Sequence, residues 1–188
     1  KLKSGVSYLV FIIPGLVMMS VLNNSFQNSS SSIVSGKFSG DLEDWRVAPL
    51  REAEILLALS LGGLTRGLVV GTMTFLTGEL FYYFMHGEFL PVMSPFLLMV
   101  FLFLGGMSFA FFGVTVAFWS RTIDQVSAVN SFVLLPLIYL GGVFFSIEGL
   151  HPAWQLISRM NPLLYFINGI RYSMIGVSDV SVEKAFVV

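Results

Sequence analysis

The chain lacks cysteine, has few charged residues and carries no recognisable catalytic motif. Cysteine is absent from all 188 residues, which excludes a disulfide framework, a thiol nucleophile and a thiolate metal site. Only 11% of the residues are charged and the formal net charge is −1, whereas soluble domains average about 25% charged residues. So few Lys and Arg residues do not form a positively charged surface that could bind nucleic acid.

Apolar residues dominate instead. Hydrophobic residues make up 55% of the chain, the mean hydropathy is +0.83, and the charges gather in short segments between long apolar stretches. A helix crosses a bilayer with about 20 predominantly apolar residues. The sequence therefore predicts an all-α, polytopic membrane protein with one membrane domain over residues 1–188 and the lipid bilayer as its surroundings. Four spans are expected, at about 6–26, 55–84, 92–118 and 126–146.

The segments between the spans differ in character. Residues 23–32 contain five Ser and three Asn, and we expect them to meet water or a partner. After Ser146, the combination of His151, Pro152 and Arg159 interrupts the apolar pattern. This predicts short interfacial or re-entrant helices at about 149–176 rather than a full span.

The orientation of the spans follows from the basic residues. Lys37, Arg46 and Arg51 lie in the first loop and Arg121 lies in the third, whereas the second loop has neither Lys nor Arg. Short cytoplasmic loops carry an excess of Lys and Arg. The first and third loops are therefore predicted to be cytoplasmic.

No motif supports an enzyme. Gly36-Lys37 resembles the end of a phosphate-binding loop, but Ser31 and Phe38 occupy places that the motif reserves for Gly and for Ser or Thr. The two histidines stand apart without metal-ligand spacing, and no Gly-x-Ser-x-Gly elbow is present. We expect neither catalytic residues nor a metal site. Two alternatives stay open: an intramembrane lipid-modifying enzyme that uses Arg66, Glu79 or His151, and a membrane assembly or scaffold protein.

The second span carries two features of its own. Arg66 and Glu79 are ionisable groups inside a span, and such groups are functional candidates by default. Both also lie close enough to a predicted membrane surface to snorkel, so a transport-pathway role and a structural role are weighed equally. Gly63, Gly67 and Gly71 lie on one helix face and indicate close helix packing, either within one subunit or between two.

The charged segment at about 36–54 is the most specific local feature. It has five acidic and three basic residues. Its form suits a short amphipathic helix with an apolar docking face formed by Leu42, Trp45 and Val47. An interfacial helix with Trp45 at the lipid headgroups fits the pattern equally well.

Several motifs in order along the chain resemble a known family. They are Phe11–Ser20 in the first span, Lys37-Phe38, Glu43-Asp44 and Val47–Leu50 in the first loop, and then Tyr139–Phe144, Asn161–Tyr165 and Arg171. Over essentially its whole length, the chain resembles the type 2 ABC exporter permeases, which pair with a separate ATPase subunit.

The resemblance implies six spans with both ends cytoplasmic, so that this chain is truncated at both ends and lacks the first and last spans. It implies a multi-pass cell-membrane permease that forms a homodimer, exports its substrate and leaves ATP to the ATPase partner, with no cofactor of its own. It also implies short outer-face helices at 149–176 and a cytoplasmic coupling segment that docks on the ATPase. The docking residues that it implies are Phe38, Asp41, Leu42, Glu43, Asp44, Trp45, Arg46 and Pro49.

Overall fold

The structure is a computed structural model that describes residues 7–178, apart from the side chains of Arg46 and Glu148. Within these residues every regular element is helical, which confirms the all-α prediction. The elements are α1 (Tyr8–Ser39), α2 (Asp41–Val47), α3 (Glu52–His86), α4 (Pro95–Trp119), α5 (Ile123–Val129), the π-helix η1 (Asn130–Leu134), α6 (Leu135–Leu140), the 3₁₀ turn η2 (Ile147–Gly149), α7 (Pro152–Met160) and α8 (Pro162–Ile175).

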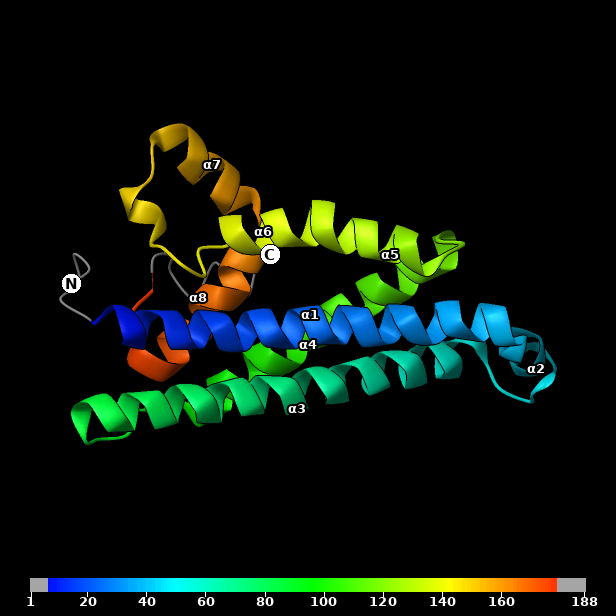
Figure 1. The fold of residues 1–188 in the computed structure, drawn as a ribbon, viewed down its shortest axis with the longest axis horizontal. Helices are drawn as coiled ribbons and strands as arrows, with labels where there is room; N and C mark the ends of the chain where they lie inside the picture. The colour runs from blue at the N-terminus through cyan, green and yellow to red at the C-terminus, as the bar shows by residue number, and fades with distance from the viewer. Residues whose placement is uncertain (1–6, 179–188) are drawn as a thin grey trace.

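Four helical runs in the described part are long and apolar enough to cross a membrane. They are α1, α3, α4 and the continuous run from Ile123 to Leu140, which confirms the predicted number of spans. Figure 1 shows α1 and α3 lying side by side along the long axis, with α2 at one end of the bundle. We call this end the α2 end; the turn from α3 to α4 lies at the opposite end.

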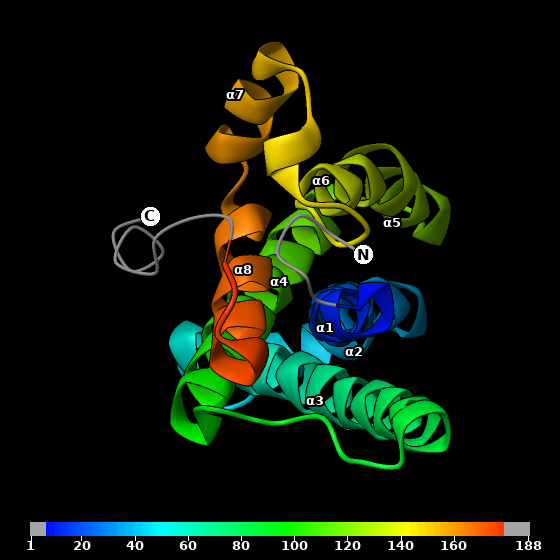
Figure 2. The ribbon, with the colours of Figure 1, turned by 90° about the vertical axis from the view of Figure 1, so that its left-hand side faces the viewer.

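Helix α1 is the centre of the bundle. It packs against α3, α4 and α8, and the end-on view of Figure 2 shows these helices around it. In its most apolar window 56% of the residues are buried, compared with 17% for the run from Ile123 to Leu140. The fourth span therefore lies at the edge of the bundle, with most of its surface free for lipid or for another chain.

The helix of the first span extends beyond the predicted limit of that span near residue 26, because α1 continues without interruption to Ser39. The polar stretch at 23–32 is helical and packs against α3. Its hydroxyl groups find partners inside the helix: Ser30 Oγ donates to the carbonyl of Phe26 at 2.7 Å and Ser32 Oγ to that of Asn28 at 2.8 Å. Serine bonded in this way does not end a helix.

The fourth span also differs from its prediction. Its helix widens into a π-helix at Asn130–Leu134, where the N–H of Leu135 bonds to the carbonyl of Asn130. The helix then ends at Leu140, before a turn in which Gly142 has φ +79°, rather than continuing to residue 146. A single π-turn inside an α-helix is rare and is frequently found at functional sites.

The segment at 149–176 forms short helices, with different surroundings for each. Helix α7 projects away from the bundle (Figures 1 and 2). Helix α8 enters the bundle and buries Leu163, Leu164 and Ile167 completely. Backbone hydrogen bonds from Met93 to Met174 (3.2 Å) and from Ser94 to Ser173 (2.8 Å) tie its end to the start of α4, so α8 is part of the core.

Candidate functional site

The charged segment folds as a tight corner between α1 and α3. Gly40 adopts φ +88°, a conformation that glycine tolerates best, and its N–H closes α1 on the carbonyl of Gly36 at 3.1 Å. The seven-residue helix α2 starts immediately afterwards, and Ser39 Oγ lies 2.6 Å from Asp41 Oδ2. Phe38 therefore belongs to the last turn of α1 and not to the loop.

The acidic side chains of α2 face outward. Asp41, Glu43 and Asp44 lie in its first turn and are exposed, where the positive end of the helix dipole favours carboxylates. The chain leaves α2 through exposed Pro49, and Glu54 Oε2 accepts the backbone N–H of Arg51 at 2.9 Å as α3 begins. Helix α2 thus presents three exposed carboxylates at this end of the bundle.

The three residues of the predicted apolar docking face differ in exposure, and their docking role stays a prediction. Leu42 and Trp45 are half-buried, and the Trp45 ring packs over Gly36, where an added Cβ would lie 3.4 Å from the ring. One edge of this ring therefore contacts α1. Val47, the third residue of the predicted face, is 83% exposed, and exposed beside it are Phe38 (66%) and Leu50 (56%). The side chain of Arg46, another predicted docking residue, lies outside the described part.

A hollow of about 940 Å³ separates α2 from the ends of the long helices. Its lining residues come from α1, α2, the turn that follows α2, α3 and α4, and they are Lys37, Gly40, Leu42, Glu43, Trp45, Leu50, Glu52, Ile55, Leu56 and Phe118. Helix α2 therefore stands off the bundle and is held mainly through Trp45 and the turn at Gly40.

Lys37 fastens α1 to the end of α4. Its Nζ donates to the carbonyls of Ala117, Phe118 and Ser120 at 2.7, 2.9 and 2.7 Å. These are the carbonyls that a helix leaves unbonded at its C-terminus, where a cation also interacts favourably with the helix dipole. The first and third loops therefore lie at the same end of the molecule, as their shared orientation requires.

The glycine stripe on α3 packs against α1. A Cβ added at Gly63 would lie 2.7 Å from the carbonyl oxygen of Ser25, and one added at Gly67 would lie 2.7 Å from that of Val21. At Gly71 the added atom would collide with the side chain of Val21. Of the two predicted uses, the structure therefore shows packing within one subunit.

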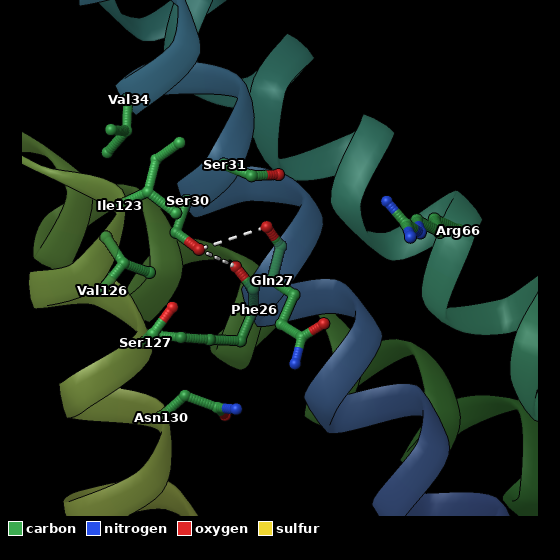
Figure 3. A pocket seen from close by; sticks show the side chains of 10 residues that line it. All are labelled: Phe26, Gln27, Ser30, Ser31, Val34, Arg66, Ile123, Val126, Ser127 and Asn130. Carbon is green, nitrogen blue, oxygen red and sulfur yellow. Dashed lines mark hydrogen bonds between the residues drawn. The ribbon is translucent and has the colours of Figure 1, made fainter.

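A smaller pocket of about 280 Å³ lies between α1 and the start of the fourth span (Figure 3). Figure 3 shows Arg66 on α3 at one side of α1, and Ser127 and Asn130 on the other. The lining residues are Phe26, Gln27, Ser30, Ser31, Val34, Arg66, Ile123, Val126, Ser127 and Asn130. Four of these ten residues therefore belong to the polar stretch at 23–32 that was expected to meet water or a partner.

Arg66 lies deeper in its helix than expected. It follows the first residue of α3 by 14 positions, which at 1.5 Å per residue is about 21 Å. Several turns of α3 therefore separate it from that end, and its side chain is exposed. Its guanidinium donates to Asn28 Oδ1 on α1 at 3.2 Å.

Glu79 and His151 make local structural contacts. Glu79 is 9% exposed and its Oε2 accepts the backbone N–H of Leu90 at 3.1 Å, which fixes the turn between α3 and α4. His151 Nδ1 accepts the N–H of Ala153 at the start of α7. Each of these contacts is made to a residue nearby in the sequence, and neither Glu79 nor His151 lines the pocket that Arg66 lines.

One functional candidate, Arg171, was known from the sequence only as part of the family resemblance. Its side chain is fully buried, with Nη2 donating to the carbonyl of Gly142 at 2.9 Å and the guanidinium 3.7 Å from the centre of the Phe11 ring. It therefore joins α8 to α1 and to the turn that ends the fourth span. No periodic pattern in the sequence predicts this role of Arg171, because its partners Gly142 and Phe11 lie far away in the chain.

The fold thus defines a polytopic α-helical membrane protein with a structured, charged element at one end. Residues 2–175 match the ABC-2 type transporter family. The chain is also 39% identical over 182 residues to the protein named inner membrane transport permease YadH of Escherichia coli K12, and equally to the proteins of that name in E. coli O157:H7 and Shigella flexneri; the match covers 97% of this chain and 69% of each relative.

The chain therefore belongs to the ABC-2 type transporter family. It is a transmembrane permease subunit of an ABC transporter and a multi-pass protein of the cell membrane. An ATPase subunit is the partner that this family implies.

Proposed function

We propose that the chain forms the substrate path of an exporter and takes its energy from the ATPase subunit through α2. The observation that carries this proposal is the outward surface at the α2 end, where three acidic side chains lie beside exposed Phe38, Val47 and Leu50. Charged groups give an interface its specificity and central apolar groups give it affinity. On this proposal the α2 end is cytoplasmic, in agreement with the positions of the basic residues.

The coupling is mechanical. Closure of the ATPase subunits on ATP would displace α2, which is joined to α1 at Gly40 and through Trp45. Because Lys37 binds the end of α4, a push on α2 reaches two spans together. Packed helices move as rigid bodies in such transitions. We propose that the chain itself binds neither ATP nor another cofactor and catalyses no reaction.

The matching test uses paired substitutions at the two ends of the bundle. Phe38→Glu should weaken co-purification with the ATPase subunit, whereas Phe89→Glu should leave it unchanged, because Phe89 is equally exposed (71%, against 66% for Phe38) but lies in the α3–α4 turn. Glu43→Arg and Glu88→Arg form a second pair with exposed carboxylates. Equal assembly by both members of each pair would refute docking at α2.

We further propose that a second copy of the chain packs on the exposed fourth span. Phe132 is 81% exposed there, and an apolar side chain on this edge suits a neighbouring helix. Because the chain has no cysteine, Phe132→Cys allows clean cross-linking with a short bis-maleimide in membranes. A dimer band with Phe132→Cys but not with Phe81→Cys on α3 supports the homodimer, and equal bands from both variants contradict this interface.

A further inference from the structure

The hollow between α2 and the long helices has mainly apolar walls. Ile55 and Leu56 line it from the start of α3 and Phe118 from the end of α4, while Leu42 and Trp45 line it from α2. Its volume of about 940 Å³ lies within the range of roughly 300–1,000 Å³ that is typical of ligand sites. Water against apolar walls is unfavourable, so the occupant that fits this hollow has an apolar part.

The hollow lies at the level where the spans end. Helix α2 stands at one end of the bundle (Figure 1), and Ile55 and Phe118 belong to the terminal turns of two helices that are long and apolar enough to cross a membrane. Lipid tails run alongside such helices, and lipid head groups lie at the level of their ends. A lipid of the adjoining leaflet therefore reaches this hollow with its head and its tails at the matching depths.

The charged side chains of the lining select the head group. An ammonium group has three N–H donors, and Lys37 Nζ directs its donors to three carbonyls at the end of α4. Glu43 and Glu52 line the hollow and are also exposed, so their carboxylates lie at its opening. The segment at 36–54 has five acidic and three basic residues, a net charge of −2 (3 − 5). This opening therefore favours a positively charged hydrogen-bond donor and disfavours an anionic group.

We propose that the hollow holds one lipid with an ammonium head group, of the phosphatidylethanolamine type. Its ammonium lies at Glu43 and Glu52, and its tails lie between α2 and the ends of α3 and α4. The lipid fills the gap beneath α2, so that α2 bears on the spans through a bound lipid as well as through Trp45 and the turn at Gly40. The site is on the side of α2 that faces the spans, and it goes beyond the proposed docking of the ATPase subunit on the outward side.

The test uses Trp45 as a reporter because its ring lines the hollow. The full-length permease with its ATPase subunit is reconstituted in phosphatidylcholine vesicles that contain increasing fractions of a lipid brominated on its acyl chains, with an ethanolamine, choline or glycerol head group. Bromine quenches tryptophan fluorescence on contact. The contribution of Trp45 is the difference between wild type and Trp45→Phe. The ethanolamine lipid should quench it at a mole fraction about two- to fivefold lower than the glycerol lipid, as expected for exposed charge pairs.

Two matched controls locate the effect. Glu43→Gln should reduce the preference for the ethanolamine lipid, whereas Asp44→Asn should leave it unchanged, because Asp44 is the neighbouring exposed acid on α2 and is not among the residues that line the hollow. Trp119 is 78% exposed at the end of α4 and also lies outside the lining. Its contribution, measured with Trp119→Phe, should be quenched equally by the three brominated lipids.

Two results would overturn the proposal: a Trp45 contribution that brominated ethanolamine lipid does not quench in an intact complex, or one that all three lipids quench equally. The first result means that protein fills the hollow, and the second means ordinary contact with the bilayer. Phe118→Trp adds a second reporter to the same hollow while Trp45 stays in place, and its added fluorescence should show the same preference. Co-purification of the ATPase subunit, measured on the same samples, tests the proposed docking separately.

Discussion

Two adjacent glycines on α3 are expected to respond in opposite ways to the same substitution. A Cβ added at Gly63 would lie 2.7 Å from the backbone carbonyl oxygen of Ser25 and would also collide with Ser29 Oγ. A Cβ added at Gly62 would meet only Asn28 Nδ2, at 3.9 Å, which is an ordinary contact. Gly63→Ala should therefore destabilise the protein, and Gly62→Ala should leave it equally stable or more stable.

The magnitude follows from two opposing effects. Replacing glycine by alanine in a helix stabilises it by about 1 kcal/mol at either position, so this effect cancels when the two variants are compared. Overpacking costs about 1–3 kcal/mol. The hydroxyl of Ser29 can rotate away, but the carbonyl of Ser25 is held in α1, and so the helices must separate. Gly63→Ala should thus be less stable than Gly62→Ala by about 1–3 kcal/mol.

The assay is the apparent melting temperature of each purified variant, read by fluorescence-detected gel filtration after heating. At about 2–4 °C per kcal/mol for a chain of this size, Gly63→Ala should melt about 2–12 °C below Gly62→Ala. Gly67→Ala should repeat the loss, because its added Cβ meets the carbonyl of Val21. Equal melting temperatures for Gly62→Ala and Gly63→Ala would refute close packing of α1 on α3.

Two further predictions concern polar anchors. Lys37→Met removes the donor to three carbonyls at the end of α4 and should lower stability by about 2 kcal/mol, a drop of about 4–8 °C in the same assay; an unchanged melting temperature would contradict the anchoring role. Glu79→Gln should be nearly neutral because an amide oxygen can still accept the N–H of Leu90, whereas Glu79→Ala should lose about 1–3 kcal/mol. Loss of transport in a stable Glu79→Gln protein would instead indicate a role for the charge.

The number and type of the spans could be predicted because long apolar runs separated by charged segments are compatible with few structures other than membrane-spanning helices. The sequence marks α3 and α4 well: Gly87 adopts φ +75° at the end of α3, and Pro95 stands at the first position of α4. Both residues are strong local signals. The π-helix had no such signal, since its register depends on how the fourth span packs.

The polar half of α1 was misjudged for a different reason. Serine and asparagine favour loops when only their neighbours in sequence are considered, but their environment here is set by α3. Val21, Ser25 and Ser29 recur every four residues and face Gly71, Gly67 and Gly63 in reverse order. Two matched four-residue periods, one of a valine and two serines and one of glycines, were therefore the available signal for an antiparallel helix pair.

That correction also links the two candidate sites. Gln27 in the pocket and Lys37 at the α2 end lie on the same uninterrupted helix α1, ten residues or about 15 Å apart. A displacement of α2 is therefore carried to the pocket by one continuous helix, without a loop that could absorb it. The facing wall of the pocket lies on the fourth span, where α5 gives way to the π-helix at Asn130. Movement of α1 against this separate wall is how docking at one end would change the shape of the pocket.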